Sequence, residues 1–214
     1  MSKYKENEKE EIKIILVGDS GVGKTNLINT SIGLGFKQNG NGTVSGSFVS
    51  KNIQIKNKKY IANLWDTAGQ EVYRGITQLF FRGSEIIILV YDICNPLSFE
   101  SLESWYKLCE ETINNEHIFA IVGNKNDLFM NSKINKKDAE KFAESKNAKF
   151  RLVSAKTDPN SFIKFIEELI KDYKNIANQT RRQSIKIDKY NKKKEKENCC
   201  NNSNAKKGNK KNQD

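Results

Sequence analysis

The segment Gly18-Asp19-Ser20-Gly21-Val22-Gly23-Lys24-Thr25 decides the fold of this 214-residue chain. It matches the pattern G-x-x-x-x-G-K-[ST] and follows an apolar run, Ile12 to Val17, that predicts a buried strand. In this pattern, backbone N–H groups turn toward phosphate oxygens, the lysine reaches the β- and γ-phosphates, and the hydroxyl binds Mg²⁺. We therefore expect the residues from Ser20 through Asn26 to bind the phosphates of a nucleoside triphosphate.

The rest of the sequence places this loop in an α/β fold. Between residues 12 and 173, short apolar runs alternate with helical patterns, which predicts a mostly parallel sheet with helices on both faces. The last helix is expected to begin at Asp158 and Pro159. In the segment 48–55, apolar and polar residues alternate less regularly, which predicts an edge or antiparallel strand. Six strands are expected, at Ile12–Gly18, Phe48–Ile55, Tyr60–Trp65, Ile86–Tyr91, Ile118–Val122 and Phe150–Val153.

A second motif, Asn124-Lys125-Asn126-Asp127, follows one of these strands and indicates which base is bound. It falls at the carboxyl end of the sheet, where ligands bind in such folds. A carboxylate there accepts two hydrogen bonds from the N1–H and amine of guanine, whereas adenine offers no matching pair of donors. Asn124, Lys125 and Asp127 are therefore expected to bind guanine. Phe129 and Met130, just after the motif, are expected to be ordinary packing residues.

Together these motifs resemble the Ras-superfamily small GTPases, over about residues 10 to 175. The resemblance adds Asp66-Thr67-Ala68-Gly69-Gln70 after a strand, and Ser154-Ala155-Lys156 as a third loop beside the base. It implies a P-loop NTPase G domain that binds GTP or GDP with Mg²⁺ and hydrolyses GTP slowly without an activating partner. The G domain is expected to be monomeric.

Further site residues are carried over by position. Thr43, nineteen residues after Lys24, matches the first-switch threonine that binds Mg²⁺, and Phe36 matches the aromatic residue beside the guanine. Asp66 is expected to hold Mg²⁺ through a water, and the Gly69 N–H to contact the γ-phosphate. Gln70 is the expected catalytic residue, which orients the attacking water. The expected metal ligands are Thr25, Thr43 and Asp66.

Within the superfamily, the chain is most similar to the Rab proteins. Stretches such as Tyr73 to Thr77 and Leu89 to Ile93 are typical of them, and Phe48, Trp65 and Phe80 fall where Rabs keep aromatic residues that face effectors. Exchange factors, activating proteins and effectors are the implied partners, at the cytosolic face of endomembranes. The segment Val44 to Phe48 departs from the Ile-Gly-Val-Asp-Phe that is usual in Rabs, so the effectors of known Rabs cannot be assigned to this chain.

The C-terminal region carries most of the charge. The chain has 37 Lys and Arg against 26 Asp and Glu, a net charge of +11, although its lysine richness also fits a compositional bias of the coding sequence. Residues 176–214 are expected to form a disordered basic tail that contacts a membrane, after a G domain at 11–175 and an N-terminal extension at 1–10. Cys199 and Cys200 resemble the twin lipidated cysteines of Rabs, but fourteen residues follow them. Trimming of the tail, another modification or no modification all remain open.

Three functions compete at this point. The favoured one is a Rab-like GTPase switch that recruits effectors in intracellular vesicle and membrane trafficking. The alternative is a catalytically weak Rab-like GTP-binding scaffold, suggested by the atypical first switch. Nucleic-acid binding rests on the tail charge alone, and we expect no nucleic-acid partner.

Overall fold

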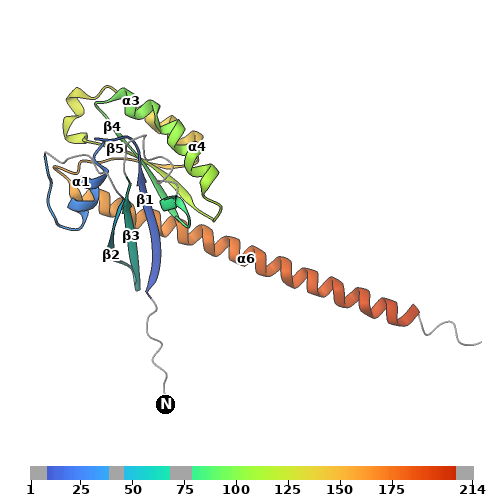
Figure 1. Ribbon diagram of the computed structural model, residues 1–214. Coiled ribbons are helices and arrows are strands. Elements are labelled where there is room, and N and C mark those ends of the chain that lie inside the picture. Colours follow the sequence, from blue (N-terminus) through green and yellow to red (C-terminus); the bar gives the residue numbers. More distant parts are fainter. Residues whose placement is uncertain (1–8, 39–45, 68–78, 206–214) are drawn as a thin grey trace, which may run out of the picture. The chain divides into compact units, whose positions relative to one another are not determined.

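The computed structural model describes residues 9–38, 46–67 and 79–205, and from residue 184 only the helical backbone. Its sheet has six strands in the order β2-β3-β1-β4-β5-β6, all parallel except the β2–β3 pair. This confirms the predicted P-loop NTPase fold class and the antiparallel edge strand (Figure 1). The strands are β1 (Glu10–Val17), β2 (Ser47–Ile55), β3 (Lys58–Asp66), β4 (Ile86–Asp92), β5 (Ile118–Asn124) and β6 (Lys149–Leu152).

Helices cover both faces of the sheet. On one face, alternate residues of β1, β4 and β5 form a buried cluster with Trp105 and Cys109 of α4 (Leu102–Thr112) and Ala139 and Ala143 of α5 (Lys136–Ser145). The intervening strand residues point to the opposite face, where α1 (Lys24–Ser31) and the start of α6 (Pro159–Ala205) bury their apolar sides (Figure 1). The described residues also include the short helix α3 (Pro96–Glu100) and the 3₁₀ helix η2 (Asn126–Asn131).

The start of α6 follows the sequence prediction. The Asp158 carboxylate accepts a hydrogen bond from the Ser161 N–H at 3.2 Å, as expected for a residue that caps this helix. Phe162, Phe165 and Ile166, which recur at the spacing of one helix face, are 0–1% exposed. Local capping and helical periodicity therefore agree with the tertiary packing.

The C-terminal region differs from the prediction. The chain divides into two compact units, Met1–Tyr173 and Lys174–Asp214, and α6 continues to Ala205. The structure therefore has a helical backbone over residues 176–205, where composition predicted disorder. Composition predicted disorder because few apolar residues occur there, but no glycine or proline interrupts residues 160–205, and the many lysines favour helix locally.

Within the described residues, no helix is both long and apolar enough to cross a lipid bilayer.

Candidate functional site: a nucleotide and Mg²⁺ site

The phosphate loop joins β1 to α1 and encloses a buried lysine. The Lys24 Nζ donates to the carbonyl oxygens of Gly18 at 2.7 Å and Asp19 at 2.9 Å. Its side chain lies almost entirely out of water, and burial lowers the pKa of Lys24 to about 8, while the negative charges of Asp66 and Asp19 act in the opposite direction. The loop thus holds a cation over its own backbone, as a triphosphate site requires.

Gly23 fits the loop because nothing larger could occupy its position. Its φ is +96°, and a Cβ there would lie 2.4 Å from the Asn124 side-chain nitrogen. That nitrogen donates to the Val22 carbonyl at 2.9 Å, and the Asn124 Oδ1 accepts from the Ala155 N–H at 3.3 Å. Asn124 is 2% exposed. This one side chain therefore connects the phosphate loop, the end of β5 and the third loop.

Two hard oxygen donors meet beside the phosphate loop. The Thr25 hydroxyl donates to the Asp66 carboxylate at 2.6 Å, and Asp66 lies opposite Leu16 where β3 pairs with β1. The next residue, Thr67, donates its hydroxyl to the Leu16 carbonyl at 2.6 Å, which fixes the end of β3. A hydroxyl and a carboxylate in contact are ligands that Mg²⁺ prefers. The residues present therefore fit the predicted metal.

The loops expected beside the base are held together by their own hydrogen bonds. The Ser154 hydroxyl donates to the Asp127 carboxylate at 2.6 Å and accepts from the N–H groups of Lys156 and Thr157 at 3.2 and 3.1 Å. Lys125 has a left-handed backbone, with φ of 65°. Its ammonium pairs with Asp92 at the end of β4, at 2.6 Å. Lys125 and Asp127, which both follow β5, are thus fixed by partners at the ends of the neighbouring strands β4 and β6.

Asn26 orients the segment that contains Phe36. Its amide donates to the Lys37 carbonyl at 2.9 Å and accepts from the Lys37 N–H at 3.1 Å. Phe36 is 41% exposed. A large aromatic side chain this open to water beside a ligand loop is consistent with the predicted contact to the base. Three predicted site residues, Thr43, Gly69 and Gln70, lie outside the described residues.

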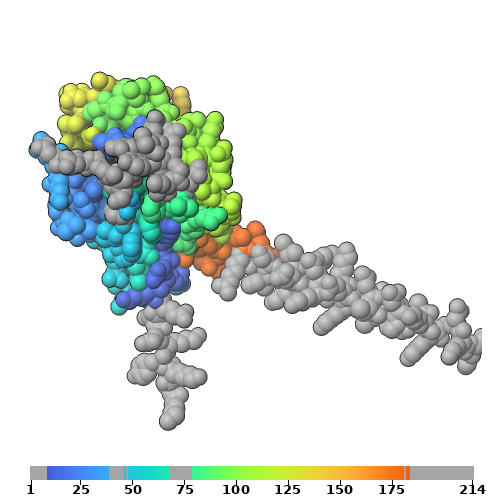
Figure 2. All heavy atoms as spheres, in the orientation of Figure 1, coloured from blue at the N-terminus to red at the C-terminus, as the bar shows by residue number. Residues whose placement is uncertain are grey.

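The predicted effector surface forms a continuous group of rings. Phe48 and Trp65 are opposite residues of β2 and β3, with centroids 5.0 Å apart, and Phe80 lies 5.6 Å from Trp65. Phe48 is 56% exposed. In Figure 2 the edge strand β2, coloured cyan, lies at the surface near α1. The sequence-predicted aromatic residues are therefore in contact; Phe48 is open to solvent, and Trp65 and Phe80 are half-buried.

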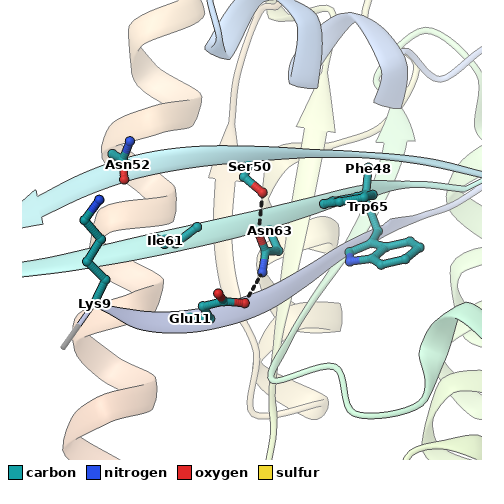
Figure 3. Close-up of a pocket in the computed structure, with 8 residues that line it drawn as sticks. All are labelled: Lys9, Glu11, Phe48, Ser50, Asn52, Ile61, Asn63 and Trp65. Carbon is teal, nitrogen blue, oxygen red and sulfur yellow. Dashed lines mark hydrogen bonds between the residues drawn. The ribbon is translucent and has the colours of Figure 1, made fainter.

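A pocket of about 590 Å³ continues from these rings along the outer face of the sheet. Within it, the Ser50 hydroxyl donates to Asn63 at 2.6 Å, and the Asn63 amide donates to Glu11 at 3.0 Å (Figure 3). Aromatic and polar groups thus lie side by side. The residues that line the pocket are Lys9, Glu11, Phe48, Ser50, Asn52, Ile61, Asn63 and Trp65.

At Gly46, where the sequence departs from the Rab pattern, the Phe80 ring packs closely on the backbone. A Cβ on Gly46 would lie 2.9 Å from two atoms of the Phe80 ring. Real Cβ atoms do not approach so closely, so this ring position depends on glycine. The chain has Gly46 where Rabs usually have valine, so Phe80 can pack directly on this backbone.

Sequence reasoning missed two features near the site. Asp19 occupies an unspecified position of the phosphate-loop pattern, yet its carboxylate accepts hydrogen bonds from Ser101 and Trp105. The motif gives no signal for this role. Phe129 and Met130 are 63% and 82% exposed, so the prediction that they are ordinary packing residues is wrong. They lie in η2, a short helix with no buried residue.

Comparison with known proteins agrees with this geometry. The Ras family model matches residues 13–175. The Ras-related protein Rab-2B of Dictyostelium discoideum is 39% identical over 162 residues, which cover 74% of this chain and 80% of that protein. The Ras-related protein Rab-7a of Paramecium octaurelia is 37% identical over 175 residues, 79% of this chain and 82% of that protein. The chain therefore belongs to the Ras family, and within it is a Rab-like small GTPase.

Proposed function

We propose that this Rab-like GTPase binds GTP and GDP with Mg²⁺ as a molecular switch and recruits effectors in vesicle and membrane trafficking. The observation that carries the proposal is the position of Asn124. Its hydrogen bonds join the phosphate loop to the third loop, so the two ends of a nucleotide would be bound by one connected unit. Family membership favours this switch over a scaffold without catalysis.

Each part of the site has a role in hydrolysis. Lys24 would neutralise the β- and γ-phosphates, and Asp127 would accept hydrogen bonds from guanine. Thr25 and Asp66, with Thr43, would hold Mg²⁺, which when bound neutralises charge on the β- and γ-phosphate oxygens. Gln70 would orient the water that attacks the γ-phosphate in line.

The reaction is proposed to be slow without a partner. The loop Gly18 to Thr25 contains Lys24 but no arginine, so it does not supply the arginine that stabilises the transition state in fast GTPases. An activating protein would bring that group. An exchange factor would release GDP, and effectors would bind the rings of Phe48, Trp65 and Phe80 when GTP is present.

The hydrolytic assignment is tested with Gln70→Leu. We expect single-turnover hydrolysis of labelled GTP to fall at least tenfold while GTP affinity stays within twofold, because Gln70 positions water and does not hold the nucleotide. Gln54→Leu, on β2 away from the site, is the matched control. Equal hydrolysis by both variants and the unaltered protein would show that Gln70 has no such role.

The basic C-terminal region is proposed to bring the protein to the cytosolic face of endomembranes. Residues 173–214 carry 13 Lys and Arg against 4 Asp and Glu, and each basic residue near an anionic membrane contributes about 1 kcal/mol. Lipidation of Cys199 and Cys200 would make the attachment stable. Mass spectrometry of the C-terminus from native cells tests this, since a mature chain that has lost both cysteines or carries no lipid would exclude a lipid anchor.

A further inference from the structure

Asp19 joins the phosphate loop to the helix beside it. Its two carboxylate oxygens accept hydrogen bonds from the Ser101 hydroxyl and from the Trp105 indole N–H, each at 2.7 Å. Its backbone carbonyl accepts from the Lys24 ammonium at 2.9 Å. One residue is therefore held by α4 through its side chain and holds the phosphate-binding lysine through its main chain. We call this set, Asp19 with Ser101 and Trp105, the Asp19 link.

The partners in the Asp19 link are themselves fixed. Trp105 is 1% exposed and belongs to the buried cluster between α4 and the sheet, so its indole cannot move without disturbing the core. Its N–H is a donor that needs an acceptor when buried. Ser101 is the residue before α4, where a negative charge is also favoured by the helix dipole. Hydrogen bonds to a carboxylate are stronger than those between neutral groups.

We infer that Asp19 is a positioning residue that fixes the phosphate loop against α4, so that nucleotide release depends on the hydrogen bonds of Ser101 and Trp105. The loop contains three glycines, and few side chains can stabilise its course. Asp19 is the loop residue whose carboxylate is bonded to a second element. If the link is broken, the Gly18 and Asp19 carbonyls that hold Lys24 are free to shift, and the phosphates are held less tightly.

The test measures the release of fluorescent GDP from the full-length protein with Mg²⁺. Trp105→Phe keeps an aromatic ring in the core but removes the N–H, and Asp19→Ala removes the acceptor. We expect Trp105→Phe to accelerate GDP release about tenfold, the factor for one charged hydrogen bond, and Asp19→Ala, which loses the bonds from both Trp105 and Ser101, to accelerate it about thirtyfold. Tyr106→Phe removes a polar atom from the next residue of α4, which bonds Glu110 at the surface, and should stay within twofold of the unaltered protein.

Two further variants separate positioning from general stability. Ser101→Ala leaves the core intact and should accelerate release about threefold, while its control, Ser104→Ala, should not. The double variant Asp19→Ala with Trp105→Phe should release GDP no faster than Asp19→Ala alone, because both changes break the same link. In NMR spectra, the Trp105 indole proton should move upfield in Asp19→Asn and stay in place in Tyr106→Phe.

The inference rests on the proposed nucleotide site, and the two can fail separately. If the unaltered protein binds no GDP, the site itself is wrong and the Asp19 link has nothing to position. If the unaltered protein binds GDP while Trp105→Phe, Asp19→Ala and Ser101→Ala all release it at the unaltered rate, the site stands and the inference is overturned. Accelerations that simply multiply in the double variant would also overturn it.

Discussion

Replacing Asn124 with alanine should weaken nucleotide binding more than any change of similar size nearby. The substitution removes hydrogen bonds to the Val22 carbonyl and from the Ala155 N–H, at 2.9 and 3.3 Å, and leaves both buried backbone groups without this partner. Such a bond contributes about 1 kcal/mol net, and a buried group left unpaired costs about 1–3 kcal/mol. Two such groups sum to roughly 2–6 kcal/mol, and we expect the lower part of that range, roughly 2–4 kcal/mol, because water can partly replace the lost side chain.

This cost should appear in the affinity because Asn124 connects the loops that would bind the two ends of the nucleotide. A loss of ~2–4 kcal/mol corresponds to about 30- to 1,000-fold weaker GDP binding, measurable by titration with fluorescent GDP. Asn126→Ala is the matched control, since Asn126 lies two residues away in the same motif and its backbone N–H bonds Val153. A folded Asn124→Ala protein that binds GDP within threefold of the unaltered protein would refute the reasoning.

Three further predictions concern the metal, the lysine and the aromatic surface. Removing Mg²⁺ with a chelator should accelerate GDP release roughly tenfold or more, because Thr25 and Asp66 would otherwise bind the nucleotide through the ion. A release rate that the chelator does not change would contradict the role of these two residues. Burial lowers the pKa of Lys24 to about 8. GDP affinity should therefore fall as pH rises from 7 to 9, because the free protein loses the ammonium that binds phosphates. GDP affinity that does not change over this pH range would contradict the role of Lys24. Gly46→Ala should displace the Phe80 ring, which a Cβ would meet at 2.9 Å, and change Trp65 fluorescence with little change in melting temperature; an unchanged spectrum would show that the ring position does not depend on glycine.

Much of the fold could be predicted from sequence because its central strands, β1, β4 and β5, are buried on both faces. Continuous apolar runs such as Ile86 to Tyr91 predict buried strands, and the observed strand Ile86–Asp92 is one residue longer than this run. The phosphate loop and the Asn124 motif could be placed because both follow strands, and parallel strand ends meet at one edge of the sheet.

What could not be predicted depends on contacts between distant residues or on local helix formation. Asp19 lies more than 80 positions before Ser101 and Trp105, and no local pattern relates them. The ring contact at Gly46 likewise depends on Phe80, which arrives from another element. The helix over residues 176–205 was missed because composition measures how much apolar surface can be buried, whereas helix propensity is local.

The central claim is that this site binds guanine nucleotides, and selectivity between GDP and ADP tests it most directly. The competition is measured with fluorescent GDP, Mg²⁺ and unlabelled GDP or ADP. A site built to accept the guanine N1–H and amine should reject ADP by about 10⁴-fold, since the acceptors that a bound base covers would lose their donors. That result would support the assignment of Asp127 and the loops around Ser154. ADP that competes within tenfold of GDP would contradict the account.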